Sequence, residues 1–380
     1  MYHFPKPEKT IIPSPRFLYF WPRNTFPMHS RFLPYFHDPL DKGPLRYFEI
    51  DSAGNNLSNG VFINESSGAC YPLMNGVPVF LSDAFPPEWI NAHYSKMNEL
   101  KGRFPGARIQ SANADLKWSF SSEWETHREK EMDTTWGFTV PSRFEQFLLE
   151  VETTRDEIRD RTILDAGCGN GMLTEYFSVN GMISFGMDFS SSVFAAEAKR
   201  KSDGVCFIRG DLRLPPFSEK FFDFIVSNGV IHHTQNTEIT FHKLAAIVKD
   251  KGKFFIWLYE RKGSLLWGIK RRIFDWLRII VSRLPAPAQK FIVGLFTRMI
   301  FFCYKLAGKK LDFHTLHVDM YDSLTPRWRH YHTPEEVSRW YFESGFGAVR
   351  LTHWDNRYGF GVYASKIPIS RPPGERWVGK

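Results

Sequence analysis

The chain has 380 residues, 43% of them hydrophobic, so it holds enough apolar material for one large core or two smaller ones and is not a single small domain. Lysine and arginine exceed the acids by 8, but residues 260–310 alone hold 12 basic and 2 acidic side chains, so the rest of the chain is slightly acidic. The four cysteines form no C-x-x-C pair, which excludes a disulfide framework and a cysteine zinc site.

Three segments precede the main repeating pattern. Residues 1–45 combine nine prolines with many aromatics, which favours an extended segment on a folded surface and excludes a signal-peptide helix, so we expect a cytoplasmic protein. Residues 46–85 hold LRYFEI, SNGVFI and YPLMNGVPVFL between turn signals, which predicts a small β unit. Residues 86–160 form a linking helical region. Within it, RFEQFLLEV is apolar at helical spacing at Phe144, Phe147, Leu148 and Val151.

From residue 161 onward, strands and helices alternate. TILDAG, MISFGMD, VCFIRGD, FFDFIVSN and GKFFIWLY are typical of strands, and helices are predicted at 171–181, 191–201 and 237–250. A later helix has Thr333 as its N-cap, Pro334 at its first position, Glu336 closing a capping box and Gly345 at its end. The strands FGAVRLTHW and YGFGVYASK follow. Residues 161–260 and 331–368 therefore predict an α/β fold with a parallel sheet and helices on both faces.

The first strand runs into ILDAGCGNG, a glycine-rich turn. It lacks the lysine and hydroxyl of a phosphate-binding loop, and its G-x-G-x-G spacing differs from the G-x-G-x-x-G of a dinucleotide site. Asp165, two residues before the first glycine, disfavours an anion and favours a cationic ligand. S-adenosylmethionine is such a ligand, because it carries an ammonium and a sulfonium and has no phosphate.

Five segments occur in order at the expected spacing: ILDAGCGNG, GMDFS, GDLRLPPF, FFDFIVSNGVIHHT and VKDKGKFFIWLY. Together they resemble the class I S-adenosylmethionine-dependent methyltransferases, of the type 11-like kind. The resemblance covers residues 161–260 strongly and 331–365 more weakly, and it implies a Rossmann-like, seven-stranded sheet with S-adenosylmethionine as cofactor. One departure is Asp250 and Lys251, where the family commonly has proline and glycine.

The resemblance also implies where the cofactor lies. The methionine end would be held by the turn, the ribose by the end of the second strand, the adenine by the end of the third, and the methyl group by the end of the fourth. The corresponding residues are Asp165, Gly167, Cys168, Gly169 and Gly171; Asp188, Phe189 and Ser190; Asp211 and Leu212; and Asn228, Gly229 and Val230.

Residues 58–81 resemble the second half of the small zinc-ribbon family that activates tRNA and translation-factor methyltransferases. The segment YPLMNGVP matches the family pattern, but Asn64 and Ser67 occupy the positions of two zinc-binding cysteines. An amide and a hydroxyl do not replace thiolates, so we expect a ribbon without metal, with Cys70 as a small core residue.

Methyl transfer to oxygen requires a group that removes a proton. His232 and His233 follow the fourth strand directly, and either could be this base or could pack and cap the next helix. Tyr321 and His332 belong to a second polar cluster, YDSLTPRWRHYHTP, which forms either a substrate wall or a surface loop. The sequence SNGV after the fourth strand lacks the N-P-P-Y-type motif that grips a planar amino group, which argues against methylation of a nucleic-acid base.

Residues 261–330 form a helical insert where this fold usually builds a substrate lid. In the segment 264–283, one face is basic and polar, whereas the other is apolar at Leu266, Ile269, Ile273, Trp276, Leu277 and Ile280. A second, more apolar helix is predicted from 289 to 306, too short in its apolar run to span a bilayer. Two interpretations stay open: residues 264–306 contact a membrane or a lipid-linked acceptor, or their apolar face is covered by residues 1–45 or a second subunit.

We therefore expect a methyltransferase that uses S-adenosylmethionine on a small-molecule, glycan or lipid-linked acceptor, with O-methylation favoured and nucleic acid disfavoured. One alternative is an RNA-modifying methyltransferase, which the ribbon resemblance and the net charge motivate. The other is a scaffold that binds S-adenosylmethionine without catalysis.

Overall fold

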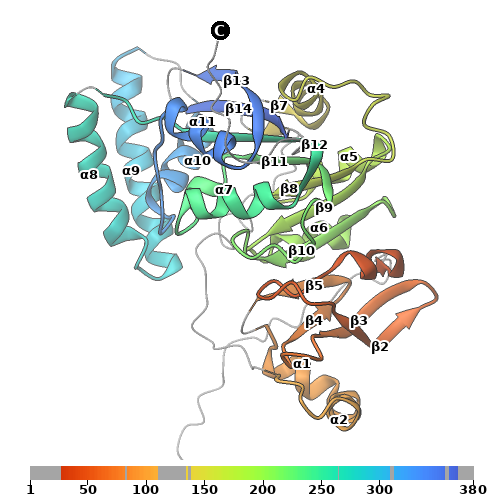
Figure 1. Ribbon diagram of the computed structural model, residues 1–380. Coiled ribbons are helices and arrows are strands. Elements are labelled where there is room, and N and C mark those ends of the chain that lie inside the picture. Colours follow the sequence, from red (N-terminus) through yellow and green to blue (C-terminus); the bar gives the residue numbers. More distant parts are fainter. Residues whose placement is uncertain are drawn as a thin grey trace, which may run out of the picture.

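The computed structural model describes residues 27–81, 84–109, 134–135, 138–263, 265–308, 312–355 and 359–366. Its centre is a twisted sheet of five parallel strands and an antiparallel hairpin (Figure 1). In spatial order these strands are β10 (Val205–Gly210), β9 (Ile183–Asp188), β8 (Thr162–Ala166), β11 (Phe222–Asn228), β12 (Val248–Tyr259), β14 (Gly359–Lys366) and β13 (Phe346–Asp355). This is the predicted α/β fold with its seven strands, so the expected fold class is confirmed.

Helices cover both faces of this sheet, which is why its strands are buried along nearly their whole length. One face carries α4 (Val140–Glu150), α5 (Met172–Val179) and α6 (Ser192–Lys199), and α4 buries the four apolar residues predicted for its inner side. The other face carries α7 (Thr237–Ala246) and α11 (Pro334–Glu343). The predicted capping box of α11 is present, with Glu336 N donating to Thr333 Oγ1 at 3.2 Å.

Residues 28–36 complete the second face. They form β1 (Met28–His29) and a 3-10 helix, η1 (Ser30–Tyr35), where α7 and α11 leave the sheet uncovered. The Phe32 ring meets Phe185 of β9 edge-on at 5.4 Å, and Phe36 packs against Phe217 at 5.9 Å. The aromatic residues of this proline-rich stretch therefore belong to the main core.

The N-terminal β unit continues the same sheet. It is an antiparallel meander of β2 (Arg46–Ala53), β3 (Asn56–Ile63), β4 (Cys70–Met74) and β5 (Val77–Phe80). β5 then pairs in parallel with β10, with Val79 opposite Arg209 and Phe80 opposite Gly210. The result, within the described residues, is one twelve-stranded sheet. Two short helices, α1 (Pro87–Ala92) and α2 (Tyr94–Arg103), pack on the outer part of the meander.

A polar network surrounds Asn64 in the turn between β3 and β4. The Asn64 side chain is buried, and its Nδ2 lies 2.9 Å from Asp38 Oδ2 and 3.0 Å from both carboxylate oxygens of Asp41. Its Oδ1 accepts from the main-chain N–H groups of Ser66 and Ser67. The amide thereby ties the β3–β4 turn to the segment that follows η1.

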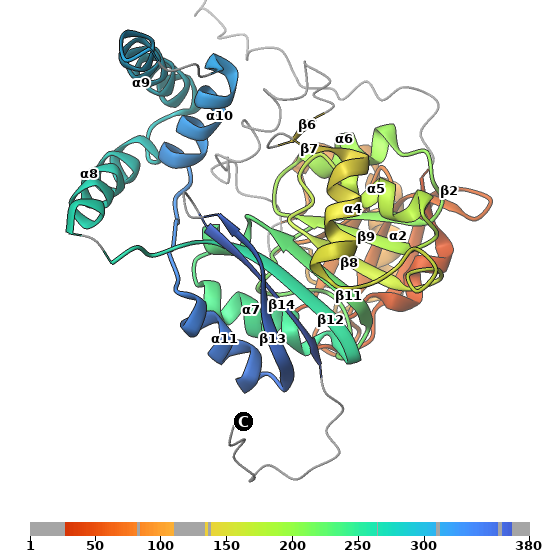
Figure 2. The same cartoon turned by 90° about the horizontal axis from the view of Figure 1, so that it is seen from above.

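The insert forms three helices that stand apart from the sheet (Figures 1 and 2). α8 (Leu265–Val281) and α9 (Ala286–Leu306) both pack on α10 (Phe313–Leu324), around a small core of Val281, Val293, Tyr321 and Leu324. The sequence patterns did not predict α10. A two-stranded ribbon of β6 (Thr134–Thr135) and β7 (Phe138–Thr139) precedes α4.

The predicted helix 237–250 was too long. α7 ends at Ala246, and Val248 already pairs with Phe222 as the first residue of β12. Val248 is buried and β-branched, and it adopts the strand conformation of β12. Lys251 has φ +64°, the left-handed conformation that the glycine at this position of the family pattern would adopt easily.

Candidate functional site

Three glycines with positive φ build the turn between β8 and α5, with φ +94° at Gly167, +54° at Gly169 and +76° at Gly171. A Cβ on Gly167 would lie 2.3 Å from Val230 Cγ2, and one on Gly171 would lie 2.5 Å from the Phe207 ring. A larger residue at either position therefore lacks both the backbone conformation and the space.

Asp188, at the end of β9, holds this turn in place. Its Oδ2 accepts from Gly169 N at 2.9 Å and its Oδ1 from Ser190 N at 2.8 Å. The Ser190 and Ser192 hydroxyls lie 2.6 Å apart, and Ser192 Oγ donates to Gly169 O at 2.7 Å. Asp188 is only partly buried, and each oxygen has a second lone pair, so the carboxylate can accept further hydrogen bonds from a ligand.

Cys168 and Phe189 lie in the same loops. The Cys168 side chain is buried under α6 among Val193, Ala196 and Phe207, and burial raises the pKa of its thiol well above the usual value. The Phe189 carbonyl accepts from Arg209 Nε at 3.2 Å. The Cys168 thiol therefore has a packing role in this structure, with its main chain in the turn.

Asp165 lies on β8 immediately beneath the turn. Its carboxylate is buried and accepts a hydrogen bond of 2.6 Å from Thr174 Oγ1 on α5. Burial raises its pKa to about 6, and the nearby Asp188 adds to this rise, whereas the Thr174 bond and Arg143 oppose it. A cation bound close to Asp165 would restore the ionised form, which is the electrostatic preference predicted from the sequence.

The end of β11 carries Asn228, Gly229 and Val230. Asn228 Oδ1, in the amide orientation that satisfies its neighbours, accepts from Nε and Nη2 of Arg143, each at 3.2 Å. Arg143 comes from α4 and also pairs with the buried Glu150 at 2.9 Å. Sequence reasoning missed Arg143, because its helix is distant in sequence from every motif and its spacing marks only an amphipathic surface.

Asp211, which follows β10, forms an ion pair with Arg213, a residue that the sequence analysis did not identify. Arg213 Nε and Nη2 lie 2.6–3.0 Å from its carboxylate oxygens, and the Arg213 main-chain N–H donates to Oδ1 at 2.9 Å. Leu212 is buried in the main core. Beside this pair is an open depression of about 580 Å³, lined by Arg213, Leu214, Gln235, Asn236, Ile239 and Lys243.

Between the sheet and the insert, a cluster of side chains forms around His233, made up of His232, Tyr259, Asp322 and Arg329. His233 Nδ1 lies 3.0 Å from the Trp328 carbonyl, and its Nε2 lies 3.5 Å from Asp322 Oδ1 of α10. Tyr259, at the end of β12, donates its hydroxyl hydrogen to Asp322 Oδ2. Burial lowers the pKa of His233, and Asp322 opposes this effect, so the imidazole is neutral at neutral pH and faces a carboxylate that can stabilise its protonated form.

The centre of the His232 ring lies 4.3 Å from that of Tyr259, with the two rings tilted by 49°, and within the described residues neither of its ring nitrogens has a hydrogen-bond partner. Burial lowers its pKa well below the usual value. Arg329 packs on the cluster, with its guanidinium 4.2 Å from the centre of the Tyr259 ring. The cluster is therefore aromatic and cationic, and its histidines are neutral at neutral pH.

The side chains of two further predicted residues pack against other elements. Tyr321 is buried in the core of the insert with Val281 and Leu324, and its neighbour Asp322 is the residue that reaches His233. The His332 ring packs on Trp340 at 4.9 Å and lies 3.3 Å from Glu336 of α11. Asp322 was noticed in the sequence as part of a polar cluster, but its partner His233, in the 3-10 helix η2 (Ile231–His233) that follows β11, is 89 residues away and no local pattern connects them.

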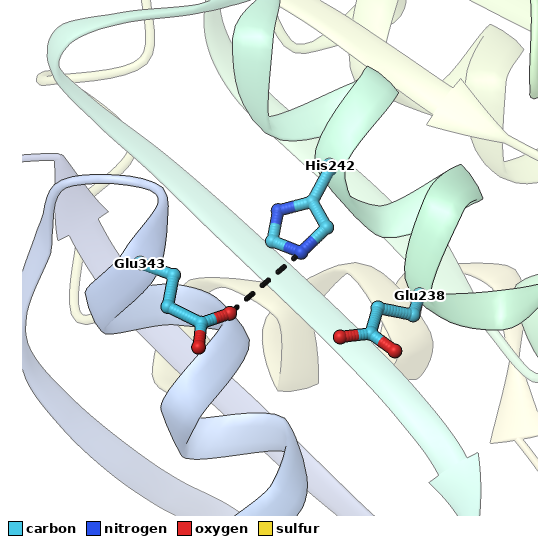
Figure 3. A group of neighbouring side chains, drawn as sticks. All are labelled: Glu238, His242 and Glu343. Carbon is cyan, nitrogen blue, oxygen red and sulfur yellow. Dashed lines mark ion pairs between the residues drawn. The ribbon is translucent and has the colours of Figure 1, made fainter.

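Among the described side chains, one group of possible metal ligands comes together, away from this cluster: Glu238 and His242 of α7 with Glu343 of α11 (Figure 3). His242 Nε2 lies 4.0 Å from Glu343 Oε2, and its Nδ1 lies 2.9 Å from Ser344 Oγ. Both glutamates are exposed. The group is explained as a surface ion pair between two helices, and it gives no reason to assign a metal.

Comparisons with known proteins show which type of domain carries these residues. The sequence model of a family described as methyltransferase domain matches residues 164–256. A candidate methyltransferase of Encephalitozoon cuniculi is 33% identical over 104 residues, which are 27% of this chain and 46% of that protein. The ubiquinone biosynthesis O-methyltransferase of Coxiella burnetii is 26% identical over 101 residues, which are 26% of this chain and 43% of that enzyme. The chain thus spans less than half the length of these relatives.

Other matches differ in their acceptors. A Mus musculus protein named for tRNA methyltransferase 9B is 27% identical over 154 residues, or 39% of this chain and 32% of that protein. A Haloferax volcanii complex of the Trm112 methyltransferase activator with a methyltransferase has a TM-score of 0.40 at 14% identity and covers 67% of this chain and all of that one. The expectation that nucleic acid is disfavoured as a partner is not supported, because the Mus musculus relative is named for a tRNA methyltransferase.

The sheet order and the glycine turn define an α/β domain of the class I methyltransferase type. Residues 164–256 are a methyltransferase domain, and S-adenosylmethionine is its cofactor.

Proposed function

We propose that the chain transfers a methyl group from S-adenosylmethionine to an oxygen of a small-molecule, glycan or lipid-linked acceptor. The observation that carries this proposal is the glycine turn held by Asp188, since Gly167 and Gly171 have no room for a side chain and Asp188 keeps free lone pairs beside them. When bound, the cofactor supplies an electrophilic methyl group on a sulfonium centre.

The side chains around the turn fit this cofactor chemically. Asp188 would accept hydrogen bonds from the two ribose hydroxyls, and Asp211 with Leu212 would border the adenine. Asp165 would favour the ammonium group, and the Arg143 guanidinium would pair with the carboxylate of the same amino-acid end. Arg143 supports this role because it reaches Asn228 at the end of β11 and influences the Asp165 carboxylate electrostatically.

The acceptor would bind between the sheet and the insert. His233 is the favoured base, because it is neutral, and because Asp322 at 3.5 Å would stabilise the proton that it takes from a hydroxyl. A depression of about 210 Å³ lies close by, between α8 and α10, and its wall includes Arg271, Phe274 and Arg329. Its size suits a small acceptor or the end group of a larger one, and its wall also holds Asp275, which pairs with Arg271 at 3.3 Å.

A tRNA acceptor is the second candidate. The Mus musculus relative favours it, as does the resemblance of residues 58–81 to the activator ribbon. We further propose that this segment is a metal-free ribbon in which the Asn64 network takes the structural place of zinc. In that case β5 would support the methyltransferase domain through its pairing with β10.

The first experiment measures calorimetric binding of S-adenosylhomocysteine and of NAD to the purified protein. We expect micromolar binding of S-adenosylhomocysteine, none of NAD, and loss of binding in Asp188→Ala. Transfer of radiolabelled methyl groups is then compared between a panel of hydroxylated small molecules, lipid-linked acceptors and tRNA. Folded protein that does not bind S-adenosylhomocysteine would refute the proposal. Binding without transfer to any acceptor would favour the scaffold, and transfer to tRNA alone would favour the second candidate.

A further inference from the structure

The outer surfaces of α8 and α9 carry an exposed apolar stripe. On α9 the stripe keeps helical spacing over four turns, with exposed side chains at Phe291, Leu295, Met299, Phe302 and Leu306. Phe291 and Leu306 are 72% and 73% exposed. On α8 the stripe consists of Ile273, Trp276 and Ile280, and Trp276 is 70% exposed. We call these eight residues the outer stripe.

The opposite faces of the same helices are the ones that pack on the protein. Val281 of α8 and Val293 and Thr297 of α9 are buried against α10. Arg278 of α8 is also buried on this side, and its Nη1 donates to the Arg327 carbonyl at 2.7 Å. The side that faces the protein thus holds an arginine beside its apolar groups, and large apolar groups also face outward, where a surface helix usually carries polar side chains.

Basic side chains border the outer stripe. Arg272, Arg283, Lys290, Arg298 and Lys305 are all exposed. In the described part of residues 265–308, the single acid is Asp275, which is within 3.3 Å of both Arg271 and Arg278. Arg298 and Lys305 each lie within one helical turn of stripe residues on α9, so their long side chains can reach headgroups while the stripe enters an apolar layer.

We propose that the outer stripe and its basic border dock the protein on an anionic lipid bilayer, with α8 and α9 lying in the plane of the interface. This inference does not depend on the proposed function. Apolar side chains enter the acyl boundary, and the five basic groups face anionic headgroups, each contributing favourably. A second copy of the chain is a poorer occupant, because a symmetric contact would bring two basic borders together.

The structure also favours docking over spanning. Contrary to the expectation from its apolar run, α9 is long and apolar enough to cross a membrane by length and composition alone, with 22% of the relevant window buried. However, Arg298 lies in the middle of the helix, and its Val293 and Thr297 side is fixed on α10. The helix would lose that core if it crossed the bilayer.

The position of the outer stripe matters for the acceptor pocket. Arg271 and Phe274 of α8 line the depression of about 210 Å³, and Trp276 of the same helix belongs to the outer stripe. The pocket therefore lies within about one helix diameter, roughly 10–12 Å, of the proposed membrane surface. If the protein docks in this way, an acceptor held in the bilayer is within reach of the pocket.

The test is flotation of the full chain with vesicles of phosphatidylcholine alone or with 30% phosphatidylglycerol (about one lipid in three, enough to give a negative surface potential). We expect binding to the anionic vesicles, weak binding to the neutral ones, and release at high salt. The variant Trp276→Ser/Phe291→Ser/Phe302→Ser removes three exposed rings of the outer stripe and should abolish binding. Leu149→Ser is the matched control, because Leu149 is 72% exposed but lies on α4.

A second variant, Arg298→Glu/Lys305→Glu, keeps the apolar groups and should weaken binding by roughly fivefold or more for each charge. Circular dichroism confirms folding of every variant. Absence of binding to anionic vesicles by the folded full chain would overturn the proposal. So would binding that appears only after residues 1–26 are deleted, which would identify that segment as the occupant. A dimer that the three serine substitutions dissociate would identify a second copy instead.

Discussion

Gly167 provides a sharp test of how the glycine turn is built. In Gly167→Ala, the new Cβ would lie 2.3 Å from Val230 Cγ2 and 2.4 Å from Cγ1, and the backbone would keep φ near +94°. Neither problem can be relieved without moving Val230, which follows the end of β11 at the predicted position of the methyl group. We expect a loss of stability and a loss of affinity for S-adenosylhomocysteine.

The expected magnitude has two parts. Holding an alanine at positive φ costs about 1–2 kcal/mol, and overpacking a filled site costs about 1–3 kcal/mol more, so the free energy of unfolding should fall by about 2–5 kcal/mol. Gly345→Ala separates the two parts. Gly345 has φ +81°, but a Cβ there would meet no atom within 4 Å. It should therefore lose about 1–2 kcal/mol only.

Urea denaturation of Gly167→Ala, Val230→Ala and the double variant measures the steric part directly. Removing the valine methyl groups makes room for the alanine, so the double variant should be more stable than the two single losses predict, by about 1–3 kcal/mol. The reasoning fails if Gly167→Ala loses no more stability than Gly345→Ala, or if the two changes are additive.

Three further outcomes can be checked. Because the pKa of Asp165 is about 6 and its ionised form attracts the ammonium group of the ligand, affinity for S-adenosylhomocysteine should be highest near pH 7 and fall below pH 6, and calorimetry of Asp165→Asn should lack this dependence. Asn64→Ala should cost about 1–3 kcal/mol by leaving buried Asp38 without its amide donor, whereas a chelator should leave the Tm of the unaltered protein unchanged; a lower Tm with chelator would indicate a metal. Tyr341→Phe should cost about 1–2 kcal/mol in urea denaturation, since its buried hydroxyl lies 3.1 Å from two main-chain carbonyls, and an unchanged midpoint would contradict this.

The local parts of the fold could be predicted from the sequence. The strand β8 and the turn after it are encoded within ten residues, and the capping box of α11 within four, so neighbouring residues alone determine them. Asp188 was identifiable because it ends a strand, and the ends of parallel strands meet at one edge of a sheet. The end of α7 was misplaced because Val248 is compatible with both helix and strand, and its pairing with Phe222 decides between them.

The remaining features depend on contacts that sequence spacing does not carry. Arg143 reaches Asn228 across 85 residues, and His233 meets Asp322 across 89. The choice of the face of α8 that packs on the protein also depends on distant contacts. Its apolar face was identified, but which face packs on α10 depends on where α10 lies, and α10 itself was missed. Leu266 and Ile269 of that face lie outside the described side chains.

The pairing of β5 with β10 has a consequence for how the molecule can be divided. Without β5, β10 would be the last strand of a parallel sheet and would offer unpaired N–H and C=O groups to any other chain. Truncation at the apparent boundary near residue 85 would create an aggregation-prone edge in place of an independent enzyme domain. The meander of β2 to β5 thus covers the edge that β10 would otherwise expose. We expect the meander and the methyltransferase domain to unfold as a single cooperative unit.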